Sequence, residues 1–84
     1  MNEDIDDFLS YIASERGLAL NTVEAYERDV KAFSKFLKEK NIVSVQFVTT
    51  ESIVSYLTQL TKDLYATASI YRSLMAIKMF FRFS

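Results

Sequence analysis

Few side chains in this sequence could carry out catalytic chemistry. The chain has neither His nor Cys, so the commonest general base, the commonest zinc ligand and any thiol nucleophile are missing. A nucleophilic Tyr would need an activating base and a cluster of cations, whereas the Arg and Lys residues are spread along the chain. The carboxylates show no paired pattern on an apolar face, and no Gly-rich loop could hold phosphates. We therefore expect no autonomous enzyme, no bound metal and no cofactor.

The distribution of charge is uneven along the chain. The net charge is −1, but residues 1–15 carry five acids and no base. Residues 16–84 carry ten bases and six acids, which leaves a net charge of +4 on the larger part of the chain. This asymmetry is typical of a protein whose second half meets an anionic partner. Ordinary solvated surfaces can produce the same count, and charge alone does not separate the two interpretations.

Two helical segments carry a polar face that suits DNA. At 100° per residue, the segment 22–40 groups polar and small residues opposite its apolar stripe: Asn21, Arg28 and Lys35, with Ala25 and Ala32 beside them. The segment 67–83 groups short side chains and a guanidinium on one side: Ser69, Arg72, Ser73 and Ala76. Cations and hydroxyls hold phosphates, Arg reaches a guanine edge, and small residues permit close approach. The threonines at the two helix starts, Thr22 and Thr67, add backbone N–H groups for phosphate. The solvated faces of amphipathic helices have a similar composition, so this interpretation also stays open.

Helices must position these faces, because apolar residues recur at helical spacing throughout the chain. The pattern predicts four helices, at about 4–16, 22–40, 50–61 and 67–83. Gly17 suits the left-handed end of the first helix, and Asn21 is expected to cap the second. Thr49 or Thr50 is expected to cap the third, and the connector 41–49 should form a loop packed on the bundle. With 84 residues, half of them hydrophobic, we predict a single all-α domain, a compact four-helix bundle.

The predicted core consists of one apolar stripe from each helix. Its members are Ile5, Phe8, Leu9 and Ile12; Val23, Tyr26, Val30, Phe33 and Leu37; Ile53, Leu57 and Leu60, with Val54 and Tyr56 at the margins; and Ile70, Leu74, Ile77 and Phe81. Phe80 and Phe83 fall on the other side of the last helix and would be exposed or need a partner outside the bundle. No apolar run is long enough to span a membrane, and the lack of Cys favours the reducing cytoplasm. The apolar pattern stops abruptly at Ser84, and we expect the chain to be one domain of a longer protein.

Two segments of the sequence resemble one family. The stretch from Leu20 to Val30, followed by Phe33 and Leu37, resembles the N-T-x-x-A-Y-x-R-D-L-x-x-F-x-x-F-L segment of tyrosine recombinases of the Xer and phage-integrase type. The stretch from Tyr65 to Phe83 resembles their S-x-x-R-x-L-S-A-[IV]-[RK]-x-F-[FY] segment, and the run from Phe8 to Thr22 also fits. The resemblance covers nearly the whole chain, in order and at the right spacing.

The resemblance implies an N-terminal core-binding domain, the four-helix SAM-like module of a bacterial or phage recombinase. Such a domain is the sequence-specific DNA-binding arm that clamps the recombination site, with its second and fourth helices at the major groove. The implied partners are double-stranded DNA, a C-terminal catalytic domain and neighbouring protomers in a synaptic tetramer, which the acidic end of helix 4–16 would help to contact. The catalytic Arg, Lys, His and Tyr of the family lie beyond this chain, and the family uses no metal or nucleotide cofactor.

Carried over by position, nine residues are expected to face DNA: Asn21, Thr22, Ala25, Arg28, Lys35, Ala68, Ser69, Arg72 and Ala76. Arg72 is the best candidate for reading a base edge, while Lys35, like Lys31 and Lys78, suits backbone positioning or a solvated surface. Met75 stands where the family usually has Ser, and Met79 where a second cation is common, so the last helix is less basic than in many relatives.

The main alternative is a SAM-like protein–protein interaction domain without DNA binding. It would use exposed aromatic side chains as anchors, namely Tyr71, Phe80 and Phe83. A helix-turn-helix regulator fits less well, because the connector 41–49 is too long for the usual tight turn.

Overall fold

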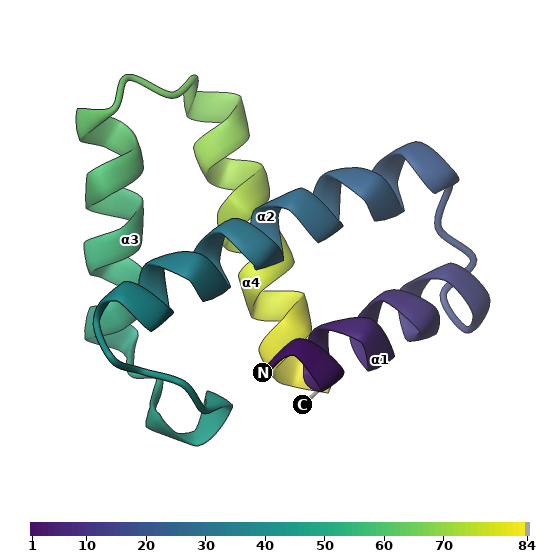
Figure 1. Cartoon of the computed structure of the whole chain (residues 1–84). Coiled ribbons are helices and arrows are strands. Elements are labelled where there is room, and N and C mark those ends of the chain that lie inside the picture. The colour runs from purple at the N-terminus through teal and green to yellow at the C-terminus, as the bar shows by residue number, and fades with distance from the viewer. Residues whose placement is uncertain (84) are drawn as a thin grey trace.

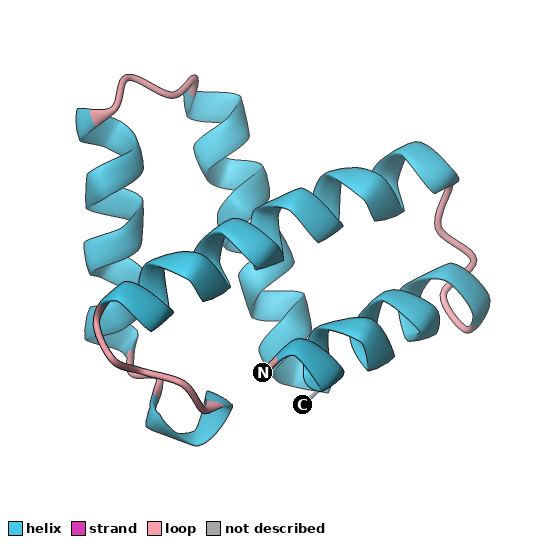
Figure 2. Cartoon of the chain, viewed as in Figure 1, coloured by secondary structure: helices cyan, strands magenta, loops and turns pink. Residues whose placement is uncertain are grey.

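The computed structural model describes residues 1–83 as a helical protein (Figures 1 and 2). The helices are α1 (Asn2–Ser14), α2 (Leu20–Glu39), α3 (Thr50–Lys62) and α4 (Thr67–Phe83), and a 3₁₀ turn, η1 (Val45–Phe47), lies between α2 and α3. Within residues 1–83 there is no strand, so the predicted all-α, four-helix fold is confirmed. The first two helices each begin two residues earlier than predicted.

Local residue chemistry accounts for several of the helix ends. Gly17 has φ +60°, the left-handed conformation predicted after the first helix, and Asn41 ends α2 with φ 64°. Thr49 caps α3 in a reciprocal box, because the Ser52 N–H donates to Thr49 Oγ1 over 3.2 Å and the Thr49 N–H donates to Ser52 Oγ over 3.3 Å. The predicted cap at Asn21 is wrong: α2 begins at Leu20 after Ala19, with no side-chain cap.

The core consists of two clusters that meet on α4. In Figure 1, α2 crosses α4, while α1 and α3 lie on opposite sides of that crossing. The first cluster joins α1, α2 and α4 and contains Ile5, Phe8, Ile12, Val30, Ala76 and Phe80. The second cluster joins α2, α3 and α4 and contains Phe33, Leu37, Tyr56, Leu60 and Ile77. Since α4 touches all three other helices, it buries more than one side.

The inward face of α4 differs from the predicted stripe. Its buried members are Ser73, Ala76, Ile77 and Phe80, whereas the predicted Ile70, Leu74 and Phe81 are only half-buried. The ring of Phe80 meets that of Phe8 at a centroid distance of 5.4 Å and is 1% exposed, because α1 covers the side of α4 that the periodicity left open. The expectation that Phe80 would be exposed or need an outside partner is therefore wrong.

Two other aromatic side chains lie differently from the prediction. Phe83 stays partly exposed, but its ring packs on Tyr11 at a centroid distance of 5.0 Å and on Phe8 at 5.9 Å. Tyr56 is buried rather than marginal, with its ring 5.1 Å from that of Phe33. Of the three aromatic anchors that a protein-interaction domain would use, only Tyr71 is largely exposed.

The connector between α2 and α3 packs on the bundle as a loop, as predicted. Ile42 and Val48 rest on the second cluster and Val45 rests on the first, while Val43 and Phe47 point to solvent. No helix in the described part of the chain is both long and apolar enough to cross a membrane.

Candidate nucleic-acid interface

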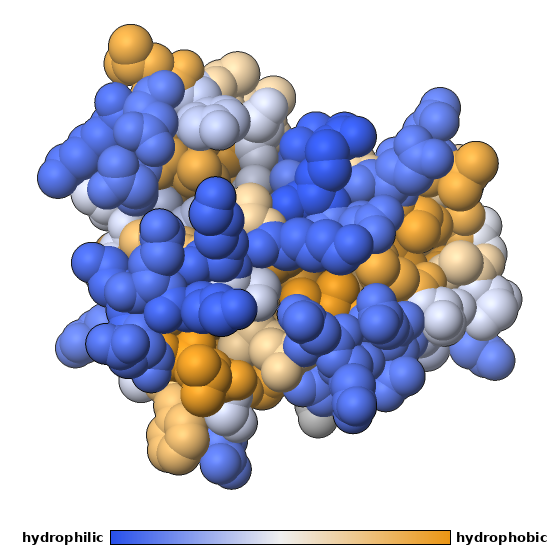
Figure 3. All heavy atoms as spheres, viewed as in Figure 1, coloured by the Kyte–Doolittle hydropathy of each residue, from blue (hydrophilic) through white to orange (hydrophobic). Residues whose placement is uncertain are grey.

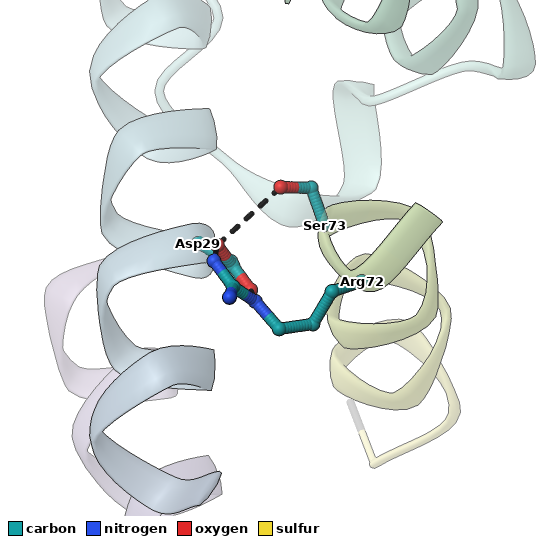
Figure 4. Close-up of polar contacts among 3 residues, drawn as sticks. All are labelled: Asp29, Arg72 and Ser73. Carbon is teal, nitrogen blue, oxygen red and sulfur yellow. Dashed lines mark hydrogen bonds and ion pairs between the residues drawn. The ribbon is translucent and has the colours of Figure 1, made fainter. Parts of the chain in front are cut away.

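A buried carboxylate joins the two helices predicted to face DNA. Asp29 on α2 accepts two hydrogen bonds from Arg72 on α4, from Nε over 2.8 Å and from Nη2 over 2.9 Å. The Ser73 hydroxyl donates a third bond to the same carboxylate over 3.3 Å. Figure 4 shows the three side chains converging between the helices. The result is a two-bond, charge-assisted contact across the α2–α4 crossing.

The two partners of this ion pair differ in exposure. The Asp29 side chain is 6% exposed, whereas the Arg72 side chain is 41% exposed. The hydrogen bond to Asp29 raises the pKa of Arg72, whose guanidinium is in any case charged at physiological pH. The Asp29 carboxylate is thus held inside the protein, while the Arg72 guanidinium that it binds is partly open to solvent.

Sequence reasoning singled out Arg72 but not Asp29, and it did not predict that the two residues pair. Asp29 stands directly before the buried Val30, at the edge of the apolar stripe of α2, and that position was the only local signal of its burial. Its partner lies 43 residues away, so no spacing within a helix could identify the pair.

Asp29 and Arg72 line a pocket of about 230 Å³. Arg28 and Ala32 line it from α2, Ser69 and Arg72 line it from α4, and Tyr65 lines it from the turn between α3 and α4. The structure therefore brings three of the predicted residues, Arg28, Ser69 and Arg72, around one opening. Two guanidiniums and a hydroxyl in such an opening can donate hydrogen bonds to phosphate oxygens or to a base edge.

Four other predicted residues lie outside this pocket. Asn21 and Ala68 are exposed in the first turns of α2 and α4, and Thr22 and Ala25 are half-buried near the start of α2. Asn21 precedes Arg28 by seven residues, about 10 Å along the helix, so it could contact DNA only at a separate point.

Lys35 lines a different hollow, between α1 and α2. This hollow, of about 430 Å³, also contains Lys31 and Lys38 from α2 and Asp6 from α1. Figure 3 shows hydrophilic side chains along α2 and over the start of α1 on this face. The Lys31 Nζ donates to Glu27 over 2.7 Å, and this bond, with a smaller contribution from Asp6, raises the pKa of Lys31. The acidic start of α1 thus lies beside the lysines of its own α2.

Ala76 is a correction to the predicted interface. It is 0% exposed and belongs to the first cluster, between α1, α2 and α4, so it cannot touch DNA. The physical reason is that α4 turns a different side inward than its apolar periodicity predicted, and this also buries Ser73. Of the residues predicted to face DNA from α4, only Ala68, Ser69 and Arg72 remain accessible.

Within residues 1–83, no group of three or more metal-ligating side chains lies together.

Known proteins match the chain over almost its whole length. A family described as "Phage integrase, N-terminal SAM-like domain" matches residues 5–84. A protein named "Tyrosine recombinase XerC" from Roseiflexus castenholzii is 35% identical over 83 residues, which are 99% of this chain and 26% of that protein. Proteins of the same name from Herpetosiphon aurantiacus and Listeria monocytogenes serotype 4a are 37% identical over 83 residues (99% of this chain, 27% of that protein) and 36% identical over 76 residues (90% and 25%).

The chain spans about a quarter of the length of these curated relatives. No solved structure matches it significantly. The match to the family covers both of the helices that carry the pocket, together with α3 and most of α1. The resemblance noted in the sequence is thereby confirmed, and the chain belongs to the family of N-terminal SAM-like domains of phage integrases.

Proposed function

We propose that this chain is the sequence-specific DNA-binding arm of a site-specific tyrosine recombinase. It clamps the recombination site through the major groove, while a C-terminal catalytic domain breaks and rejoins the strands in the bacterial cytoplasm. Its partners are double-stranded DNA, that catalytic domain and neighbouring protomers in a synaptic tetramer. The observation that carries the proposal is the gathering of Arg28, Ser69 and Arg72 around one pocket, on the two helices that the family segments span.

The residues at the pocket have different roles in this proposal. Arg28 is exposed and, among residues 1–83, has no acidic partner, so its charge is free to neutralise a phosphate. Arg72 presents a partly exposed guanidinium for a base edge. Ser69 adds a short hydroxyl for a phosphate oxygen. The exposed Asn21 and Lys35, which precede and follow Arg28 on α2, contact the DNA backbone at other points.

The burial of Phe80 weighs against the alternative of a protein-interaction domain. That domain would need a cluster of exposed aromatic anchors, but Phe80 lies in the first cluster and Phe83 packs on α1. Of the three predicted anchors, only Tyr71 remains largely exposed.

Salt titration of DNA binding tests the proposal directly. The 84-residue chain is titrated with fluorescent random-sequence duplexes at several salt concentrations. We expect log K to fall linearly with log salt, with a slope that corresponds to a few phosphates.

Arg28→Ala should weaken binding to all duplexes alike and reduce the slope by about one. Arg82→Ala is the matched control, because Arg82 is exposed at the far end of α4, about 15 Å along the helix from Arg72. Binding without salt dependence, or equal effects of the two Ala variants, would contradict the proposal.

A further inference from the structure

We propose that Asp29 is a positioning residue for DNA recognition. It holds the guanidinium of Arg72 so that the Nη1 and Nη2 N–H groups, a fork of two donors, are already in place to bind a guanine. This inference rests on the proposed function and adds to it a residue and a mode of recognition. It starts from the three hydrogen bonds that converge on the Asp29 carboxylate.

The geometry divides the guanidinium of Arg72 into an occupied edge and a free edge. A guanidinium has five N–H donors arranged in a plane. Asp29 takes the Nε and Nη2 side, at 2.8 and 2.9 Å. Within residues 1–83, no acceptor binds Nη1, and the second Nη2 hydrogen is also unused. The edge formed by Nη1 and Nη2 is therefore the part of Arg72 that is available to a ligand at the pocket.

The carboxylate that holds Arg72 is itself buried and hydrogen-bonded. Asp29 is 6% exposed, sits in the middle of α2 and receives a further hydrogen bond from Ser73, which is also buried. A free arginine loses much rotational freedom when it binds, whereas an arginine held in place beforehand loses less. This preorganisation is worth roughly two- to tenfold in affinity for a single side chain.

Charge decides which DNA group the free edge suits. Asp29 neutralises Arg72, so the pair as a whole is uncharged and attracts a phosphate weakly. A guanine presents two uncharged acceptors, O6 and N7, at the spacing of two guanidinium donors. Arg28, at the same pocket, has no carboxylate partner among the described residues and keeps its full charge. The arrangement therefore assigns base reading to Arg72 and phosphate binding to Arg28.

Asp29→Asn tests this assignment, because it should raise the affinity for random duplexes and lower the preference for a guanine. The variant unpairs the charge of Arg72, so binding to random duplexes should strengthen and the salt slope should steepen by up to about one. The Asn amide has one oxygen where Asp29 has two, so it cannot hold the Nε and Nη2 donors in a side-by-side pair. Preference for a guanine should therefore fall at one position of the sequence that wild type selects from a random pool. A loss of about tenfold in that preference is expected. A purely structural role for Asp29 would weaken selected and random duplexes by the same factor.

Two further measurements keep the proposal testable if Asp29→Asn folds poorly by circular dichroism. Arg72→Lys keeps the ion pair but loses the fork, so guanine preference should fall while the salt slope stays unchanged. Without DNA, the Arg72 Nε–H signal in nitrogen-15 NMR should exchange slowly with water. Fast exchange in wild type, or guanine preference that survives Arg72→Lys, overturns the positioning role even if duplex binding itself is confirmed. If wild type shows no salt-dependent duplex binding, the proposed function itself fails.

Discussion

Replacing Arg72 by Ala should cost more stability than replacing Asp29 by Ala, although both changes break the same ion pair. Arg72→Ala leaves a charged carboxylate that is 6% exposed, with only the Ser73 hydroxyl to bind it. Asp29→Ala leaves a guanidinium that is already 41% exposed and can turn into water. The difference arises because an unpaired charge is costly only where water cannot reach it.

The exposure of each partner sets the expected loss of stability for each change. Breaking a buried pair so that one charge is left unpaired typically costs about 3–5 kcal/mol. Water reaches the Arg72 side chain in the folded protein, so water will also reach part of the space that this side chain leaves in Arg72→Ala. We therefore expect Arg72→Ala to lower the free energy of unfolding by about 2–4 kcal/mol. Asp29→Ala loses hydrogen bonds without burying a charge and should cost about 1–2 kcal/mol. The double variant removes the stranded carboxylate and should therefore be more stable than Arg72→Ala alone.

Urea unfolding followed by helical circular dichroism measures these free energies at neutral pH. Arg82→Ala, a change at an exposed guanidinium, should stay within about 0.5 kcal/mol of wild type. The reasoning fails if Asp29→Ala is as costly as Arg72→Ala, or if the double variant is less stable than both single variants. Because Arg72→Ala can unfold a domain of this size, Arg72→Lys is the better variant for DNA-binding assays.

Three further predictions concern single side chains. Burial raises the pKa of Tyr56 from 10.0 to about 12, so the folded state keeps its phenolic proton while the unfolded state loses it. Stability should fall by about 2–3 kcal/mol as the pH rises from about 10 to about 12, and Tyr56→Phe should remove this decline when urea unfolding is compared near both ends of that range. Thr49→Ala breaks the capping box of α3 and should cost about 1 kcal/mol by urea unfolding, whereas Thr50→Ala, inside the helix, should cost less. Leu64 has φ 62° and is 89% exposed, so Leu64→Asn should stabilise the chain by about 0.5–1 kcal/mol; a Tm that stays level or falls would contradict this.

The sequence by itself determined the elements and the family. Apolar residues at helical spacing predicted four helices at nearly their observed bounds, because a helix buries one stripe whatever it packs against. Gly17 marked one helix end and the pair Thr49 or Thr50 marked another, since a left-handed residue and a side-chain cap act within a single turn. The two family segments predicted the membership that the known proteins confirm, and this pointed to α2 and α4 as the helices of interest.

The tertiary structure alone decided which sides of those helices are free. Helical periodicity could not orient α4 correctly, because α4 packs on three helices and its apolar surface is too wide to define one stripe. The orientation buries Phe80 and Ala76, and it removes Ala76 from the predicted interface. The pairing of Asp29 with Arg72 likewise depends on the crossing of α2 and α4. The two residues are 43 positions apart, and only the packing of the clusters brings their side chains within hydrogen-bond distance.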